Sequence, residues 1–249
     1  MKLITLNIWG GRACKDSGIF DKYSDTDIWC FQEVYKDATN YYDATDNESD
    51  ANRELFKDIE SHLKSHKSNF CQVLDGIYGI STFLKDEIQI VSRGELLVAK
   101  GAWEDTSDMH NRDHHRKLQW FEIMLNGKKI LLMNVHLTHR PQGKMDSEKR
   151  LNQSKIICDF MNMFDCPKIL VGDFNLLPDT ESINMIEKAG MRNLVKEYDI
   201  KSTRTELYGK PLQFADYIFV SKEIEVVDFK VLPDVVSDHS PLFLEFEVK

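Results

Sequence analysis

Apolar residues recur along the chain in short runs separated by polar or glycine-containing segments. Runs of this kind favour β-strands. The predicted strands cover residues 1–9, 28–34, 118–125, 129–137, 168–171, 214–220 and 242–248. Asn126-Gly127, between two of these strands, predicts a tight hairpin turn.

Two longer segments and one short one have the pattern of helices. Apolar residues at helical spacing predict an amphipathic helix over 51–67. A second helix is predicted over 146–164, with Asp146 or Ser147 as its N-cap, and a short third helix over 178–190. We expect the charged residues of the helix over 51–67 to face solvent.

The remaining segments are predicted to be a β-meander and loops. The stretch 70–98 holds several β-rich pieces broken by turn residues, whereas 37–50 and 101–117 are polar and lack periodicity. Strands recur over the whole chain with a few helices between them. We therefore predict one α+β domain over 1–249, in which two sheets pack face to face and helices cover the outside.

The most informative strand runs from Lys168 to Val171 and is closed by Gly172-Asp173-Phe174-Asn175. Side chains two apart on an extended backbone point to the same side, so Asp173 and Asn175 are predicted to lie together while Phe174 enters the core. An acid beside a metal can orient a water and take its proton, and an amide can contact a phosphate oxygen. The alternative is an ordinary solvated loop at a strand end.

Other polar residues lie near strand ends in the same way. They are Asn7, Glu33, Asn134, His136, His139 and Asp216. A buried carboxylate such as Glu33 needs a partner charge or a metal, although a strand-end acid can also reach solvent. Asn7 can be a turn residue before Gly10, and a lone strand histidine is more often structural. The grouping of these residues at strand ends nevertheless favours a common site on one edge of the sandwich.

Asp216 and His239 are predicted to form a hydrogen bond, although they are far apart in sequence. Asp216 is an acid inside an apolar run and needs a donor, and His239 follows Asp238 at the entrance of the closing strand. A nearby carboxylate would raise the histidine pKa and leave the second ring nitrogen as a charged donor. The alternative is that Asp216 caps a backbone turn and His239 is exposed.

The polar segment 110–116 contains three histidines and an aspartate, but their spacing matches no zinc motif. Arg112 or Arg116 is a better candidate, as a group that holds a substrate phosphate. An exposed polar loop is the alternative.

Composition narrows the class of protein. The chain has 249 residues, 42% hydrophobic and 29% charged, with a net charge of −9. This balance is ordinary for a globular protein with a full core and argues against a broad basic face for duplex binding. The five cysteines are an odd number without a Cys-x-x-Cys pair. Together with the lack of a signal peptide and of a membrane-length apolar run, they predict a cytoplasmic protein, which we expect to be a monomer.

Six motifs taken together resemble the endonuclease/exonuclease/phosphatase superfamily. In chain order they are Asn7, Gln32-Glu33, Asn134-Val135-His136, Gly172-Asp173-Phe174-Asn175, Asp216-Tyr217-Ile218 and Ser237-Asp238-His239. Each motif alone is weak, but their order is specific, and the resemblance spans Leu3 to Val248. It implies a four-layered α/β sandwich with two packed mixed β-sheets flanked by helices, the DNase I-like fold.

The resemblance also implies roles for single residues. Glu33, Asn7 and Asp238 look like ligands of Mg²⁺ or Mn²⁺, and oxygen ligands independently favour these ions over zinc. Asp173 looks like the residue that orients or deprotonates the attacking water, with Asn175 as its partner. His239, oriented by Asp216, is expected to hold the scissile phosphate. His136 looks like a second contact to the phosphate or the leaving group, and Asn134 is expected to contact the substrate. The implied reaction is in-line attack of metal-activated water on a phosphoester.

The superfamily does not fix the substrate, since its members cut nucleic acids, lipids and small phosphoesters. We expect a nuclease acting on DNA or RNA. A phosphohydrolase of the sphingomyelinase or inositol-phosphatase kind is the alternative, motivated by the acidic net charge. A binding module without activity is disfavoured, because every position needed for chemistry holds the expected residue type.

Overall fold

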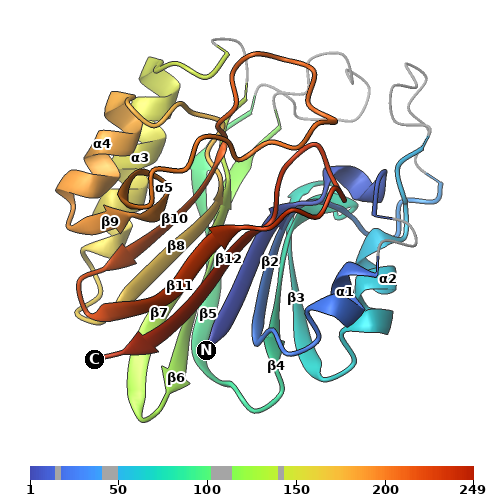
Figure 1. Ribbon diagram of the computed structural model, residues 1–249, viewed down its shortest axis with the longest axis horizontal. Coiled ribbons are helices and arrows are strands. Elements are labelled where there is room, and N and C mark those ends of the chain that lie inside the picture. Colours follow the sequence, from blue (N-terminus) through green and yellow to red (C-terminus); the bar gives the residue numbers. More distant parts are fainter. Residues whose placement is uncertain (15–17, 41–49, 102–113, 140–142) are drawn as a thin grey trace.

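The computed structural model describes residues 1–14, 18–40, 50–101, 114–139 and 143–249. Two six-stranded sheets pack face to face, with helices on the outer side of each (Figure 1). The four-layered sandwich expected from the sequence is therefore confirmed.

Sheet A has the strand order β11-β12-β1-β2-β4-β3. The strands β1 and β2 are parallel and all other neighbours are antiparallel, so the sheet is mixed. The bounds are Lys2–Asn7 (β1), Ile28–Tyr35 (β2), His66–Leu74 (β3), Tyr78–Lys85 (β4), Ile224–Val231 (β11) and Leu242–Val248 (β12).

Sheet B has the order β5-β6-β7-β8-β10-β9 and is also mixed, with β7 and β8 as its parallel pair. The bounds are Gln89–Ala99 (β5), Arg116–Leu125 (β6), Lys128–His136 (β7), Lys168–Asp173 (β8), Met191–Asn193 (β9) and Asp216–Ser221 (β10). The Asn126-Gly127 turn between β6 and β7 has positive φ at both residues, as a type I′ hairpin requires.

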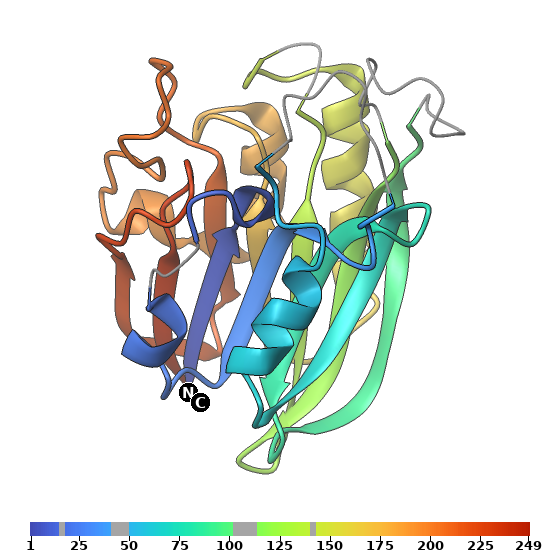
Figure 2. The same ribbon diagram turned by 90° about the vertical axis from the view of Figure 1, so that its right-hand side faces the viewer.

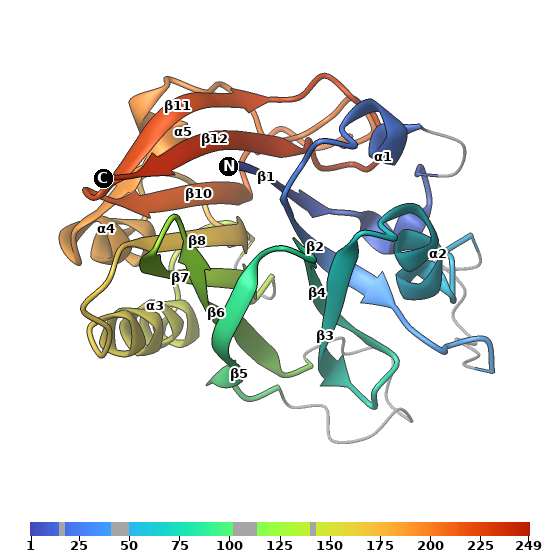
Figure 3. The same cartoon turned by 90° about the horizontal axis from the view of Figure 1, so that it is seen from below.

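Helices form the two outer layers (Figure 2 and, from below, Figure 3). Those beside sheet A are α1 (Ile19–Lys22) and α2 (Leu55–His62), and a short 3₁₀ turn, η1, covers Trp9–Gly11. Those beside sheet B are α3 (Glu148–Met161), α4 (Glu181–Lys188) and α5 (Leu194–Glu197). In the described part of the chain no helix is long and apolar enough to cross a membrane.

The alternation in β1 divides its side chains between two cores. Leu3 belongs to the large core that also holds Met133 and Leu170 of sheet B, whereas Ile4 and Leu6 belong to the core under α1 and α2. Both faces of the strand are thus buried. Burial of this apolar surface is the main stabilising contribution to the sandwich.

Two sequence predictions about the elements were wrong in detail, and four elements were missed. The helix expected over 51–67 is shorter, because Leu63 ends it and β3 starts at His66. The meander over 70–98 does not stay in one sheet, since β5 crosses to sheet B and pairs with β6. The strands β9 and β11 and the helices α1 and α5 were not predicted.

The structure decides between the two N-cap candidates of α3. The Ser147 hydroxyl accepts from the Arg150 backbone N–H, so Ser147 is the N-cap. Asp146 instead accepts from the backbone N–H groups of Glu181 and Ser182 at 2.7 and 3.0 Å. It therefore caps α4, a helix far along the chain, and joins the two outer helices.

Candidate active site

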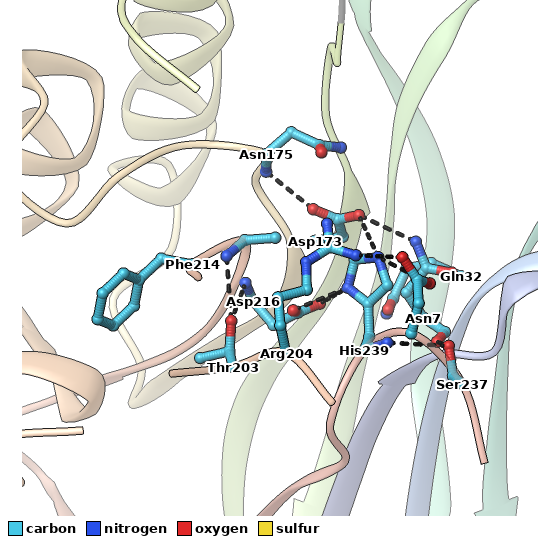
Figure 4. Close-up of polar contacts among 12 residues, drawn as sticks. Asn7, Gln32, Asp173, Asn175, Thr203, Arg204, Phe214, Asp216, Ser237 and His239 are labelled. Atoms are coloured by element: carbon cyan, nitrogen blue, oxygen red, sulfur yellow. Dashed lines mark hydrogen bonds and ion pairs between the residues drawn. The ribbon is translucent and has the colours of Figure 1, made fainter. Parts of the chain in front are cut away.

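The register of the sheets brings the predicted residues together at one edge. Asn7 ends β1, and His136 and Asp173 are paired at the ends of the parallel strands β7 and β8. Asp216 begins β10 directly opposite Asp173. Because the two sheets face each other, these ends meet across the sandwich (Figure 4).

Gly172 allows β8 to lie close to β7 just before Asp173. Its φ is +131°, and a Cβ atom at this position would lie 2.0 Å from the Val135 carbonyl oxygen. Any side chain here would therefore both strain the backbone and force the parallel strands apart. The placement of the Asp173 carboxylate depends on this close approach.

We expect Gly172→Ala to lower the free energy of unfolding by about 3 kcal/mol or more, through strain and a backbone clash. Denaturant unfolding measures this loss. The matched control is Gly209→Ala, because a Cβ at Gly209 meets nothing within 4 Å; it should stay within about 0.5 kcal/mol of wild type. Equal denaturant midpoints for Gly172→Ala and Gly209→Ala would show that β8 and β7 do not need a glycine at position 172.

Asn7 links the two acids of the site. Its side-chain N–H donates to Glu33 Oε1 at 3.0 Å and to Asp173 Oδ2 at 2.9 Å, and its Oδ1 accepts from the Trp9 backbone N–H. Asn7 is fully buried, so its orientation is fixed by these bonds. One amide therefore holds a carboxylate from each sheet at a common point.

Glu33 reaches this point through a bulge in β2. The pairing with β4 shifts between Phe31 and Val34, and Glu33 has φ +59°. A non-glycine residue in this region costs about 1–3 kcal/mol and is found most often at functional sites. The pKa of Glu33 is raised, chiefly by burial and further by the nearby Asp238 and Asp173 carboxylates.

The Asp173 carboxylate is buried but stays ionised. Burial alone would raise its pKa, but the positive charges of His239, Arg204 and other nearby groups hold that pKa well below its usual range. Its Oδ1 accepts from the Asn175 backbone N–H at 2.8 Å. Phe174 between them is fully buried, as predicted. The carboxylate is thus a fixed anion with one oxygen toward the site.

The predicted Asp216–His239 pair is confirmed. His239 Nδ1 donates to the Asp216 carboxylate at 2.8 and 2.9 Å. Burial would lower the pKa of His239, but Asp216 raises it, and the net direction is upward. Its Nε2 lies 3.7 Å from Asp173 Oδ2. The Ser237 hydroxyl supports the loop, since it accepts from the His239 N–H and donates to the Asn7 carbonyl.

The residues at this edge fit a metal ion. Ligand atoms of Glu33, His136 and Asp173 lie within 4.8 Å of one another, as do those of Asp173, Asp216 and His239. Asp238 Oδ1 is also buried without a hydrogen-bond partner among the described residues. A set rich in carboxylate oxygen with an unsatisfied anionic atom suits a hard divalent cation.

Comparison with known proteins agrees with this geometry. The sequence profile of the Endonuclease/Exonuclease/phosphatase family matches residues 4–239. The chain belongs to this family. Its buried cluster of acids and histidines suits metal-dependent hydrolysis.

Individual relatives are distant. UPF0294 protein YE0917 of Yersinia enterocolitica is 28% identical over 123 residues, which are 49% of this chain and 44% of that protein. The chain thus spans about half the length of the curated relatives that it matches. Mannosyl-6-phosphatase Bt3783 of Bacteroides thetaiotaomicron has a similar structure, with TM-score 0.75, 18% identity and 99% of both chains covered. Humanized D. rerio TDP2 has TM-score 0.71 at 16% identity, covering 100% of this chain and 99% of that one.

Asn134, which was predicted to contact the substrate, lies away from the site. Asn134 is fully buried between the sheets, accepts from Gln32 Nε2 at 2.8 Å and donates to the Ser81 carbonyl. Its amide has no access to a substrate. The interpretation of Asn134 as a substrate contact is therefore corrected: it is a polar link between sheet A and sheet B.

Two of the other predicted residues, Asn175 and His136, lie at the site. The Asn175 side chain accepts from His139 Nδ1 at 3.0 Å and donates to the Leu137 carbonyl. His136 Nε2 lies 3.6 Å from Asp173 Oδ2, and burial and the Arg116 charge hold the pKa of His136 well below its ordinary value. Arg116 is buried at the start of β6, and its phosphate role stays a prediction. Arg112 lies outside the described residues.

Sequence reasoning missed two basic residues beside the site. Arg204 Nη1 donates to Asp238 Oδ2 at 2.7 Å, and Lys144 Nζ donates to the Phe214 carbonyl. Both lie in segments without strand or helix pattern, and no local signal marked them. Asp238 was expected to serve a metal, and its second oxygen is instead occupied by an arginine.

Positive charge is concentrated around the site although the protein is acidic. Among the described residues, the Lys and Arg side chains that are buried are Arg116, Lys144, Arg150 and Arg204. Arg150 donates to the carbonyls of Thr138 and His139, which follow β7. Arg204 and Lys144 contribute to the low pKa of Asp173. A site built in this way is suited to an anionic substrate.

Proposed function

We propose that this protein is a Mg²⁺-dependent phosphodiesterase acting on DNA or RNA. The observation that carries the proposal is the arrangement in which Asn7 joins Glu33 to Asp173, facing the Asp216–His239 pair. It places an ionised base, acidic metal ligands and a charged donor at one point. These are the parts needed for hydrolysis of a phosphoester.

Glu33 and Asp238 would hold the ion, with Asn7 beside Glu33 and His136 at the margin of the site. Carboxylate oxygens favour Mg²⁺ or Mn²⁺ over softer metals. When bound, the ion would neutralise the charge that develops on the phosphoryl oxygens.

The protein groups divide the remaining work. Asp173, ionised and held by the Asn7 amide and the Asn175 N–H, orients a water and accepts its proton. His239, kept in one tautomer by Asp216, donates from Nε2 to a non-bridging phosphate oxygen. His136 is a neutral donor beside Asp173, because the pKa of its imidazole is strongly lowered.

Two observations bear on the substrate class. The buried basic residues near the site support binding of a phosphate chain. The net charge of −9 instead favours a small phosphoester, which needs no broad basic surface. A sugar phosphate, like the one in the name of mannosyl-6-phosphatase Bt3783, is then the alternative substrate.

A substrate panel separates the two. Single-stranded DNA, duplex DNA, RNA, sugar phosphates, inositol phosphates and sphingomyelin are each incubated with Mg²⁺ and with EDTA. We expect Mg²⁺-dependent cleavage of a nucleic acid. Turnover of a small or lipid phosphoester without cleavage of any nucleic acid would make the alternative substrate class the better one.

The metal assignment predicts the effect of Glu33→Gln. The variant keeps the shape of the side chain but removes its charge, and a hard cation needs anionic oxygen. Loss of a residue that only hydrogen-bonds to a metal ligand lowers metal affinity by roughly 10- to 100-fold. We expect the loss of a ligand charge in Glu33→Gln to lower the Mn²⁺ affinity, measured by calorimetry, by at least this factor. The fold should survive, as judged by circular dichroism. Unchanged affinity would show that Glu33 is not a ligand.

We further propose a reducing compartment, the cytoplasm. In the described part of the chain the cysteines form no disulfide.

A further inference from the structure

Two buried cations lie next to each other beside the site and are only partly satisfied. Lys144 is 2% exposed and Arg204 is 8% exposed. Arg204 has one carboxylate partner, Asp238, and its Nε is buried without a hydrogen-bond partner among the described residues. Burial and the charge of Arg204 lower the pKa of Lys144 to about 8.

Tyr208 joins these two cations. The Arg204 guanidinium lies 4.1 Å and Lys144 Nζ lies 5.4 Å from the centroid of its ring. A third cation, Lys210, lies 6.0 Å from the same centroid. The loop that follows α5 thus carries Arg204, Tyr208 and Lys210 to the edge of the site, where they meet Lys144.

The scissile phosphate does not require all of this charge. A phosphodiester has two non-bridging oxygens, and in the proposed function the bound ion and His239 would already contact them. Buried like charges repel each other and are costly to keep together without an anion. Asp238 pairs directly with Arg204. Asp173, Asp216 and Asp238 attract Lys144 from a distance, but among the described residues the only hydrogen bond of Lys144 Nζ is to the Phe214 carbonyl.

We propose that Lys144 and Arg204, held by Tyr208, bind a second anionic group of the substrate, a phosphate next to the scissile one. This inference rests on the proposed function and deepens it. It assigns the substrate to molecules with at least two phosphates along a chain. A nucleic acid strand carries neighbouring phosphates of this kind, whereas a sugar monophosphate does not.

The test compares the dinucleotide TpT with its phosphorylated forms pTpT and TpTp, which carry a second phosphate on one side or the other. Wild type should show a kcat/KM about tenfold or more higher for one phosphorylated form than for TpT, the size of a charge-assisted contact. Lys144→Met should reduce this ratio toward one, and Lys144→Arg should keep most of it. The control is Lys222→Met, since the Lys222 side chain is 87% exposed; it should leave the ratio unchanged.

Binding gives a readout that does not depend on turnover. Calorimetry compares thymidine 3′,5′-bisphosphate with thymidine 5′-monophosphate, and wild type should prefer the bisphosphate by a similar factor. Lys144→Met should remove this preference, and if that variant does not fold, Arg204→Gln carries the same expectation.

Three results would overturn the inference: no preference in wild type, a preference that Lys144→Met retains, or an equal loss on TpT and its phosphorylated forms. The last would place Lys144 on the scissile phosphate. A lack of hydrolysis of every phosphoester, with the bisphosphate preference intact, would instead refute the proposed function alone.

Discussion

Replacement of Asp173 by asparagine is expected to lower kcat on a phosphodiester by about 10³-fold, with the fold retained. The Asp173 carboxylate accepts from the Asn7 amide and from the Asn175 N–H, and its pKa is held well below the usual range. Asparagine has nearly the same shape but cannot take a proton from water. It also presents an N–H group toward one of the two donors that now face the carboxylate.

The measurement is kcat on the p-nitrophenyl ester of thymidine 5′-monophosphate with Mg²⁺. Asp159→Asn is the matched control, because Asp159 is an exposed residue of α3 whose carboxylate pairs with Lys155. It should have wild-type activity. An Asp173→Asn variant within a few-fold of wild type would exclude Asp173 as the base.

Asp216→Asn is expected to lower kcat by about 10²- to 10⁴-fold with little effect on metal affinity. Asp216 fixes the tautomer of His239 through Nδ1 and raises its pKa. Without the carboxylate, Nε2 is no longer held as a charged donor toward the phosphate. Calorimetry with Mn²⁺ should give an affinity close to that of wild type.

The same pair predicts the pH dependence of activity. His239 is protonated below its raised pKa, so activity should decline as the pH rises through a value above the ordinary 6.5. In Asp216→Asn the raising interaction is lost, and the decline should begin at lower pH. Identical pH profiles for wild type and variant would show that His239 does not act as the charged donor.

The parts of the site that the sequence predicted share one physical property. Asp173, Asp216 and Asn7 are polar residues inside or at the end of apolar strands, where an unpaired polar group is costly. Their partners had to be one another, and the Asp216–His239 bond follows from this argument. The sequence marked Gly172 only as the end of a buried strand, and the close approach of β8 to β7 at this glycine is seen only in the structure.

The missed parts lack such a signal. Arg204 and Lys144 lie in irregular segments, and their burial depends on how loops cross the strand ends, which no local pattern encodes. Asn134 misled for the opposite reason. It shares a face of β7 with His136 but lies two residues further from the strand end, so its side chain is enclosed between the sheets, where it contacts Gln32 and Ser81.

The bulge in β2 that places Glu33 at the site could not be predicted from the sequence either. The run 28–34 predicts a regular strand, in which alternate residues would share a face. Alternation places Gln32 between the sheets, toward Asn134, and would place Glu33 on the opposite face with Trp29 and Phe31. The bulge after Phe31, with Glu33 at φ +59°, instead brings the Glu33 carboxylate to the site. This tertiary constraint overrides the simple alternation.

The central claim is that the edge formed by Glu33, Asp173 and His239 hydrolyses phosphoesters with a divalent metal. Release of p-nitrophenol from bis(p-nitrophenyl) phosphate tests it most directly. The account predicts release with Mg²⁺ or Mn²⁺, none in EDTA, and recovery when the metal is restored. Release no faster than the enzyme-free blank with either ion, or release unaffected by EDTA, would contradict it.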